Sequence, residues 1–389
     1  MFFRKAFNGY NHWWRYILVL VAVFFGYGVG QIPLTLAINR SFHADDSLTN
    51  KALESFTENP NFELFGINSN MGFALLLMLF VGAFTAFFFI FKPIHQREFK
   101  TLITPSSRIK WDKILFGFFL WLGLAMLMEL IAYFLYQGQY TIQFKLNTFI
   151  PLLLLSILLL PVQTSLEELV FRGYLLQGVG TKKLKELLAL IIAILATIGL
   201  TPILKDAFTS VINDPESFSI TGMLALVCAI ILIFLIYNLV TLLIRKTPLN
   251  DNAFLNSNFK VVPLIITSIL FGMMHMSNPE IAEFGTGIMQ VYYISAGLAL
   301  GIMTIMDDGL ELALGVHAAT NFVGAVFVGY DGAAIQTDSI LKTSDLNPSL
   351  MAYGFIAISI IFLLIVKQKY KWESFNKLFA KIDQSQNVV

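Results

Sequence analysis

Two adjacent carboxylates and one guanidinium lie inside a long apolar stretch of the sequence. They are Glu167, Glu168 and Arg172, within the segment Pro161–Gly180. A charged side chain in hydrocarbon costs several kcal/mol unless it is paired or faces water, so such residues mark candidate functional sites. On a helix, Glu168 and Arg172 are four residues apart and share a face, where they can form an ion pair. Glu167 lies elsewhere around the helix and is left without a local partner.

Two of the five histidines also lie inside apolar runs. His275 follows Phe271 by one helical turn, and His317 precedes Asn321 by one turn on the same helical face. Polar groups in a membrane are costly in isolation and are stabilised when they contact one another. We therefore expect Glu167, His275, His317 and Asn321 to converge from separate helices.

Such a group of side chains suits the hydrolysis of a peptide bond. A carboxylate beside an imidazole can take a proton from water and pass it to a leaving amine. A second histidine together with an asparagine amide can donate hydrogen bonds to a developing oxyanion. The same Glu167, His275 and His317 could instead hold Zn²⁺ with an open water position. The H-E-x-x-H signature is absent, so the ligands of a metal would have to come from separate helices.

The composition indicates a membrane protein. Of the 389 residues, 57% are hydrophobic and only 13% are charged, whereas a soluble domain carries about a quarter charged residues. The net charge of +1 argues against a nucleic-acid-binding surface. The single cysteine, Cys228, permits neither an intrachain disulfide nor a cysteine metal cluster.

Windows of about 20 apolar residues predict an all-α, polytopic transmembrane helix bundle with about eight to ten spanning helices. The ten candidate spans are Tyr16–Ile38, Met71–Phe91, Ile114–Tyr136, Phe149–Gly178, Leu187–Leu204, Ile220–Ile244, Val261–Met276, Gly287–Met306, Leu310–Val328 and Met351–Val366. Few residues separate the pair between Gly287 and Val328, so one of the two helices could be re-entrant. The predicted partner of this bundle is the lipid bilayer.

Charges in the loops predict the orientation of the chain. Basic residues gather before the first span and in every second loop, and acidic residues occupy the alternate loops. Because basic loops stay in the cytoplasm, both termini are predicted to be cytoplasmic.

Single residues suggest further local features. Pro161 predicts a kink in the span Phe149–Gly178, and Gly297 with Gly301 predicts a close contact between helices. Outside the apolar runs, polar residues are expected to be solvated. These are His12, His43 and His95, together with Asp307, Asp308 and Glu311 in a turn.

The motif residues resemble those of the CAAX-protease and bacteriocin-processing intramembrane proteases, which include the Rce1-type prenyl endopeptidases. The pattern of that family is E-E-x-x-x-R, then F-x-x-x-H, then H-x-x-x-N or D, on separate transmembrane helices. This sequence carries all three motifs in that order, as Glu167-Glu168 with Arg172, Phe271 with His275, and His317 with Asn321. The resemblance covers residues 149–329, the expected Rce1-like protease core. Residues 1–148 would form N-terminal transmembrane helices with an external loop at 39–70. Residues 330–389 would form an external loop, the last span and a cytoplasmic tail.

The resemblance implies a role for each motif residue. Glu167 would be the catalytic carboxylate and would activate water with His275, while His317 and Asn321 would form the oxyanion site. Supporting residues would be Glu168, Arg172 and Phe271. The family is also described as metalloproteases, so a zinc cofactor and a purely glutamate-dependent mechanism are both implied.

The predicted function is therefore an intramembrane endopeptidase in a bacterial inner (plasma) membrane. Its substrate would be a membrane-associated protein or peptide, cleaved either as a CAAX-type target or during bacteriocin or peptide maturation. Two other classes of function fit the same polar residues. One is a non-proteolytic scaffold or bacteriocin-immunity protein that binds a peptide. The other is an ion-coupled transporter that uses Glu129 as a relay, although no inverted repeat is detectable.

Overall fold

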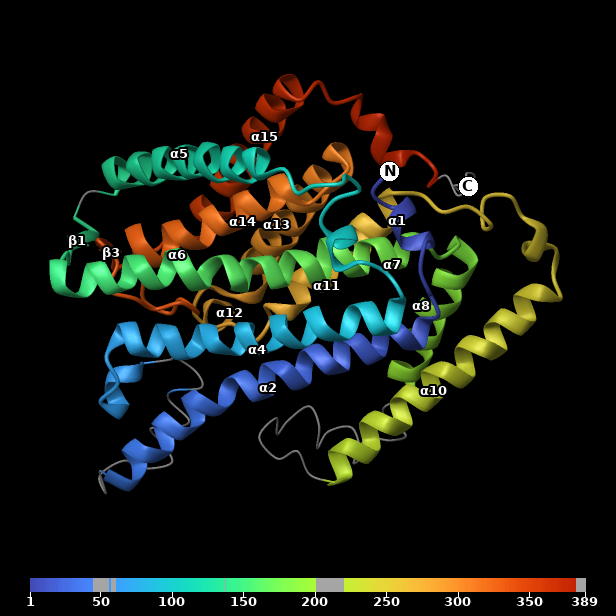
Figure 1. The fold of residues 1–389 in the computed structure, drawn as a ribbon, viewed down its shortest axis with the longest axis horizontal. Coiled ribbons are helices and arrows are strands. Elements are labelled where there is room, and N and C mark those ends of the chain that lie inside the picture. Colours follow the sequence, from blue (N-terminus) through green and yellow to red (C-terminus); the bar gives the residue numbers. More distant parts are fainter. Residues whose placement is uncertain (45–55, 57–60, 137, 201–219, 383–389) are drawn as a thin grey trace. The chain divides into compact units, whose positions relative to one another are not determined.

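The computed structural model of this chain describes residues 1–44, 56, 61–136, 138–200 and 220–382. The chain divides into two compact units (Figure 1). The first comprises Met1–Gly178 with Lys260–Val389, and the second comprises Val179–Phe259. All the predicted site residues belong to the first unit. The predicted core at residues 149–329 contains parts of both units, and its boundaries stay a prediction.

The first unit is built almost entirely of helices. Its α-helices are α1 (Arg4–Phe7), α2 (Trp13–Ala44), α4 (Ser69–His95), α5 (Trp111–Leu135), α6 (Leu146–Glu168), α7 (Leu176–Gly180), α11 (Val261–Met274), α12 (Pro279–Phe284), α13 (Thr286–Asp307), α14 (Glu311–Phe322) and α15 (Pro348–Lys369). Two π-helical stretches, η3 (Leu169–Leu175) and η5 (Val323–Phe327), follow α6 and α14. Short 3₁₀ turns lie at η1 (Phe62–Phe65), η2 (Phe99–Leu102) and η6 (Phe375–Phe379).

The second unit contains α8 (Leu184–Gly199), α10 (Ile220–Arg245) and the 3₁₀ turn η4 (Pro248–Asp251). Helices α8 and α10 pack against each other. The backbone N–H groups of Leu184 and Lys185 donate to carbonyls of the segment after η4, at Ser257 and Leu255. The start of α8 is thereby fixed within its own unit.

Seven helices among the described residues are long and apolar enough to cross a membrane, which confirms the polytopic bundle. They are Trp13–His43, Ser69–His95, Trp111–Leu135, Leu146–Gly180, Val227–Arg245, Thr286–Asp307 and Pro348–Lys369. Two further apolar helices, Val261–Met274 and Glu311–Phe327, are shorter than the spans predicted there. The predicted span Leu187–Leu204 corresponds to α8, and residues 201–204 lie outside the described part. The cytoplasmic placement of both termini stays a prediction.

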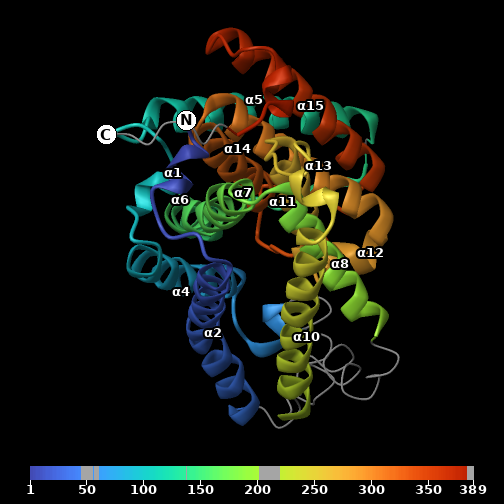
Figure 2. The ribbon, with the colours of Figure 1, turned by 90° about the vertical axis from the view of Figure 1, so that its right-hand side faces the viewer.

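Helix α6 and its continuation form the centre of the first unit. Seen along its axis, α6 lies between α4 and α14 (Figure 2), and it packs on both. The α-helical pattern runs through Pro161 to Glu168 and then becomes π-helical over Leu169–Leu175. A departure from regular α-helix therefore directly follows the two glutamates, and the kink at Pro161 stays a prediction. Such π turns recur at functional sites because they change the direction of side chains locally.

Glycines hold the helix that carries His317 against α5. A Cβ atom on Gly117 of α5 would lie 2.9 Å from the Leu312 carbonyl oxygen of α14. A Cβ atom on Gly315 of α14 would in turn collide with the Ile114 carbonyl of α5. Small residues allow helix backbones to approach closely in a membrane, where packing drives helix association. Gly117 and Gly315 thus set the position of α14.

We expect Gly117→Ala to destabilise the protein by about 1–3 kcal/mol, because the added methyl group meets backbone and forces α5 and α14 apart. Gly123→Ala is the matched control on the same helix, since no atom lies within 4 Å of a Cβ placed there. In the control, alanine should be neutral or stabilising by up to about 1 kcal/mol. Thermal unfolding in detergent micelles measures both. Equal midpoints for the two variants would contradict the proposed backbone contact.

The close helix contact predicted at Gly297 and Gly301 is confirmed. A Cβ atom on Gly297 of α13 would lie 2.8 Å from the Cα atom of Ser268 in α11, and Gly301 abuts Leu264 one turn away. Helices α11 and α13 therefore pack backbone to backbone. This contact places the part of α13 that precedes Gly297 next to the end of α11, where His275 lies.

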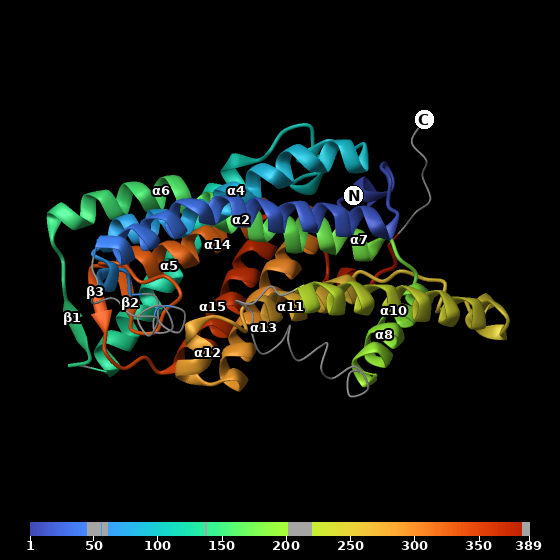
Figure 3. The same ribbon diagram turned by 90° about the horizontal axis from the view of Figure 1, so that it is seen from below.

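A small sheet that the sequence did not predict lies at the end of the first unit opposite the N-terminus (Figures 1 and 3). Its strands are β1 (Tyr140–Ile142), β2 (Val328–Tyr330) and β3 (Leu341–Thr343), in the order β1-β3-β2. β1 pairs antiparallel to β3, and β2 pairs parallel to it. Strands of three residues are too short to show an alternating pattern in the sequence.

His95 is not solvated as predicted. Its side chain is buried, with Nδ1 on the Tyr10 carbonyl at 2.7 Å and Nε2 on the Tyr174 hydroxyl at 2.8 Å. The reason is that the N-terminal segment folds back over the end of α4. His12 and His43 are exposed, as predicted.

The acidic turn after α13 is also less solvated than predicted. Asp307 is nearly buried and pairs with Lys113 of α5 at 2.7 Å, and Glu311 is only 1% exposed. Asp308, with a left-handed φ of 55°, pairs with the N-terminal ammonium and with Lys377. Burial tends to raise the pKa of Asp308, but these two cations hold it below its usual value. Neighbouring segments thus cover and neutralise the turn.

Candidate active site

Glu168 joins two helices through one oxygen atom. Its Oε1 accepts from Nη1 of Arg172 at 2.7 Å and from Nδ1 of His317 at 2.7 Å. Neither Glu168 nor Arg172 is exposed. The ion pair expected from their spacing is therefore formed, and it extends to α14 through His317. Since charge-assisted hydrogen bonds are short and directional, the pair fixes the imidazole ring.

Glu167 lies beside the same imidazole. Its Oε2 is 3.7 Å from Nε2 of His317, and the carboxylate side chain is 16% exposed. Among the described residues, no group makes a hydrogen bond to the buried Oε2. The oxygen atom closest to His317 is thus the one that the protein leaves available for a proton.

The hydrogen bond to Glu168 assigns the proton on His317. A carboxylate oxygen accepts, so Nδ1 of His317 must be the donor in that contact. In the neutral ring Nε2 then carries a lone pair and faces Oε2 of Glu167. At 3.7 Å the two acceptors are beyond direct hydrogen-bond distance. A single water molecule placed beside them can donate one of its O–H groups to Glu167 Oε2.

A glutamine that sequence reasoning missed connects Asn321 to Glu167. Gln163, one turn before Glu167 on α6, donates from Nε2 to Glu167 Oε1 at 2.5 Å. Its Oε1 accepts from Nδ2 of Asn321 at 2.9 Å. The available signal was the i,i+4 spacing of Gln163 and Glu167 on one helical face. The structure therefore brings Glu167, Asn321 and His317 together, with Gln163 as the link.

His275 lies at the end of α11 and approaches this group from another side. Its Nδ1 contacts the Phe271 carbonyl at 2.7 Å. Because a carbonyl only accepts, Nδ1 carries the proton and Nε2 is free to accept. Glu167, His317 and Arg172 all act electrostatically on His275. Among the described residues, no hydrogen bond or ion pair joins His275 to Glu167, His317 or Arg172. His275 therefore borders this cluster without direct contact.

Phe271 packs the two halves of the cluster together. The guanidinium carbon of Arg172 lies 4.1 Å from the centre of the Phe271 ring, a cation–π distance. The Phe271 ring also lies 4.5 Å from the His275 ring and 6.1 Å from the His317 ring, between centroids. This residue therefore shields the buried Arg172 and borders both imidazoles.

The predicted zinc ligands do not form a three-ligand group. Among the described residues, no set of three or more His, Cys, Asp or Glu side chains is arranged to hold a metal ion. Glu167 and His317 offer two donors near one point, whereas a catalytic zinc site requires three. Because the donor set does not fit, the chemistry below is derived from protein groups and water alone.

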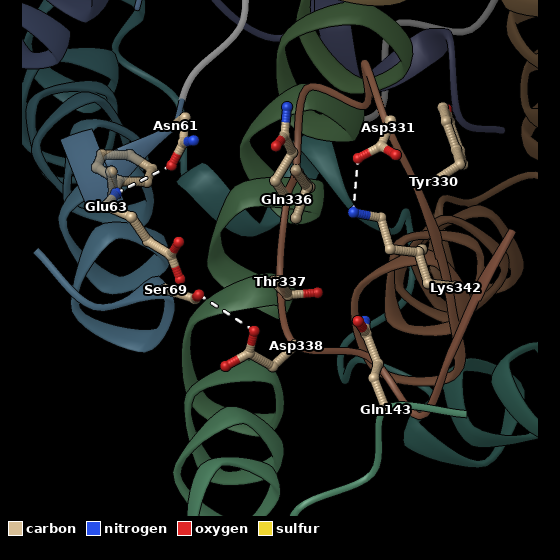
Figure 4. Close-up of a pocket in the computed structure, with 13 residues that line it drawn as sticks. Asn61, Glu63, Ser69, Gln143, Tyr330, Asp331, Gln336, Thr337, Asp338 and Lys342 are labelled. Atoms are coloured by element: carbon tan, nitrogen blue, oxygen red, sulfur yellow. Dashed lines mark hydrogen bonds and ion pairs between the residues drawn. The ribbon is translucent and has the colours of Figure 1, made fainter. Parts of the chain in front are cut away.

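A polar cavity of about 230 Å³ lies at the sheet, apart from the motif residues (Figure 4). Lys342 and Asp331 form an ion pair on one side of it, and Ser69 donates to Asp338 on the other. None of the motif residues lines it. Glu167 is 21 residues along α6 from Leu146, or about 31 Å at the helical rise. This cavity is therefore separate from the candidate active site.

Comparison with known proteins bears on part of the motif set. Residues 241–323 match the family model "Type II CAAX prenyl endopeptidase Rce1-like", which confirms the resemblance for this range. The matched range contains Phe271, His275, His317 and Asn321, whereas the Glu167–Arg172 motif precedes it.

A search of curated proteins gives one full-length relative. The chain is 25% identical over 362 residues to "Uncharacterized protein YyaK" of Bacillus subtilis (strain 168), covering 92% of this chain and 93% of the relative. No solved structure matches the chain.

Proposed function

Starting from the Rce1-like match at residues 241–323, we propose that this chain is an intramembrane endopeptidase that hydrolyses peptide bonds with an activated water molecule. The observation that carries the proposal is the buried Glu167 Oε2, which lies 3.7 Å from His317 Nε2 and has no hydrogen-bond partner among the described residues. A base of this kind has to be within hydrogen-bond reach of its water. The family match alone would not identify which carboxylate acts.

The contacts support the following reaction. Glu167 Oε2 takes one proton from water as the water oxygen attacks the carbonyl carbon of the scissile bond. That proton reaches the amine nitrogen as the C–N bond breaks, directly from Glu167 or through the adjacent His317 Nε2. The second proton of the water stays on the new carboxyl group, so the products are a carboxylic acid and an amine, and no covalent enzyme intermediate is required. His275, with its Nε2 able to accept, orients the second O–H of the water.

The contacts favour Asn321 as the donor to the oxyanion. Its Nδ2 uses one N–H on Gln163 and retains a second one for the substrate. His317 was expected to share this role, but its Nδ1–H is held by Glu168. His317 could donate from Nε2 only when the ring carries both protons. We therefore assign it to proton transfer, beside Glu167.

The proposed substrate is a membrane-associated protein or peptide, cleaved as a CAAX-type target or during peptide maturation. The buried position of the cluster within an apolar bundle supports this class, because the scissile bond must reach it inside the membrane. The proposed location is the plasma membrane of a bacterium, which the long apolar helices and the occurrence of a relative in Bacillus subtilis support.

Cleavage by the purified chain in proteoliposomes tests the proposal. Peptides embedded in the bilayer, with and without a prenylated C-terminal cysteine, are incubated with the protein, and the products are identified by mass spectrometry. New termini at a defined bond support proteolysis, and a preference between the two peptides identifies the substrate class. Peptide binding without any cleavage would instead favour the scaffold or immunity function. Substrate flux that disappears with Glu129→Gln would favour a transporter.

We expect this cleavage to survive removal of divalent metal. The described residues supply two donors near Glu167 and not the three that a zinc site needs. The measurement compares initial rates before and after dialysis against a chelator, together with the zinc content of the protein. Loss of activity on chelation that is restored by Zn²⁺ would contradict the expectation.

A further inference from the structure

The His275 imidazole is held on three sides by its surroundings. Its Nδ1 contacts the Phe271 carbonyl at 2.7 Å, and the Phe271 ring lies 4.5 Å away between centroids. The ring of Tyr293 stacks on it with a centroid distance of 4.2 Å and an interplanar angle of 21°. Tyr293 comes from α13, so a second helix determines the plane in which the imidazole lies.

Helix α13 is fixed against α11 over the length that leads to Tyr293. Gly301 and Gly297 abut Leu264 and Ser268 of α11. Nearer the start of α13, Nε2 of Gln290 donates to the Gly272 carbonyl at 2.9 Å. Since Gln290, Gly297 and Gly301 are seven and four residues apart, they share one face of α13. Tyr293 lies between Gln290 and Gly297 on this packed segment, so the contacts between α13 and α11 determine where its ring lies.

The hydroxyl group of Tyr293 is also engaged. Asn278 donates to it from Nδ2 at 3.1 Å, and the carboxylate of Glu280 interacts with it electrostatically. Glu280 is only 5% exposed, and its Oε1 accepts from the Ala334 N–H at 2.8 Å and the Tyr330 hydroxyl at 3.4 Å. Burial raises the pKa of Glu280, against the effect of these hydrogen bonds. The segment after β2 thus anchors the group that contacts Tyr293.

We propose that Tyr293 is a positioning residue for the hydrolysis described above, because its ring holds the His275 imidazole in the plane that keeps Nδ1 on the Phe271 carbonyl and Nε2 available to the reacting water. The inference rests on the proposed function. It adds a residue outside the three motifs, and it assigns Asn278 and Glu280 the task of fixing the Tyr293 hydroxyl. Placement errors of about 1 Å in such groups can lower a rate by about 100-fold.

Three variants separate positioning from general packing. Tyr293→Leu removes the stacked ring, Tyr293→Phe keeps it, and Tyr292→Leu is the matched control on the same helix. Tyr292 packs on Phe355 of α15 with centroids 5.1 Å apart and edge-on against Tyr293 at 5.2 Å. Among the described residues it makes no ring contact with His275, so its replacement reports on packing next to Tyr293 without removing the ring that stacks on the imidazole. With the peptide substrate, Tyr293→Leu should lower kcat by roughly 10- to 100-fold and leave KM within about twofold. Tyr293→Phe should restore kcat to within about threefold of the wild type, whereas Tyr292→Leu should leave it unchanged.

A second readout does not depend on proteolysis. In protein labelled with ¹⁵N-histidine, the His275 ring should give the signal of one tautomer with the proton on Nδ1. Tyr293→Leu should convert it into an average of both tautomers, and Tyr292→Leu and Tyr293→Phe should not.

The two readouts separate the outcomes. A wild-type protein without any protease activity whose His275 signal still responds to Tyr293→Leu alone would end the proposed function but support the positioning of the ring. An unchanged kcat and an unchanged His275 signal in Tyr293→Leu would overturn the inference. Equal effects of Tyr292→Leu and Tyr293→Leu would do the same, because they would show only loss of packing.

Discussion

Glu167→Gln is expected to lower the rate of peptide cleavage by roughly 10²- to 10⁴-fold, the usual contribution of a general base. The substitution keeps the shape of the side chain, and an amide oxygen can still accept the hydrogen bond from Gln163. It removes the charge and the proton-accepting capacity at the position facing His317. Initial rates on the bilayer-embedded peptide, with thermal unfolding as the measure of folding, test the prediction.

Glu129→Gln is the matched control for Glu167→Gln. It makes the same chemical change at another glutamate in a spanning helix, α5, outside the hydrogen-bonded cluster. We expect the cleavage rate of Glu129→Gln to stay within about twofold of the wild type, because the substitution leaves Glu167 and its contacts with Gln163 and His317 unchanged. A fully active Glu167→Gln protein would remove Glu167 from the mechanism. Equal losses in both variants would indicate a general effect of intramembrane carboxylates.

Glu168→Ala is expected to destabilise the protein by about 3–5 kcal/mol, because it leaves the guanidinium of Arg172 buried without its counterion. Arg172 is fully buried, and its Nε and Nη2 atoms already have no hydrogen-bond partner among the described residues. The substitution also frees Nδ1 of His317, which Glu168 holds at 2.7 Å. Chemical unfolding in micelles measures the loss, and a change below about 1 kcal/mol would contradict the buried ion pair.

A double variant distinguishes the two tasks of Glu168. In Glu168→Leu with Arg172→Met, no uncompensated charge remains, and apolar replacements of a buried pair are often neutral or stabilising. We therefore expect the double variant to recover stability but not cleavage, because His317 still lacks its acceptor. Recovery of cleavage as well would show that Glu168 serves only to neutralise Arg172.

The sequence was sufficient for features that depend on neighbours along the chain. Apolar windows predicted the long helices, because a span needs a continuous run of residues. The Glu168–Arg172 ion pair follows from i,i+4 spacing, which any helix converts into contact. The Gly297–Gly301 contact was predictable for the same reason, since both residues share one face. In each case the physical rule acts within one element.

Burial and partners that come from distant segments were not predictable in this way. His95 lies beside polar residues in the sequence, yet the N-terminal segment buries it with the Tyr10 carbonyl. Asp307 and Glu311 were predicted to lie in a solvated turn, yet in the structure Lys113 and neighbouring segments cover them. The small sheet joins strands that are about 200 residues apart in the chain, with Tyr140 opposite Thr343. Pairings of this kind leave no periodic signal.

The candidate site combines both kinds of information. The sequence alone determined which residues are too costly to be isolated in a membrane, and hence that Glu167, His275, His317 and Asn321 needed partners. Only the tertiary structure decided that His317, and not His275, lies closest to Glu167. It also decided that Gln163 links Glu167 to Asn321. The reason is that helix spacing fixes the face on which a side chain lies, whereas the packing of one helix on another fixes which faces meet.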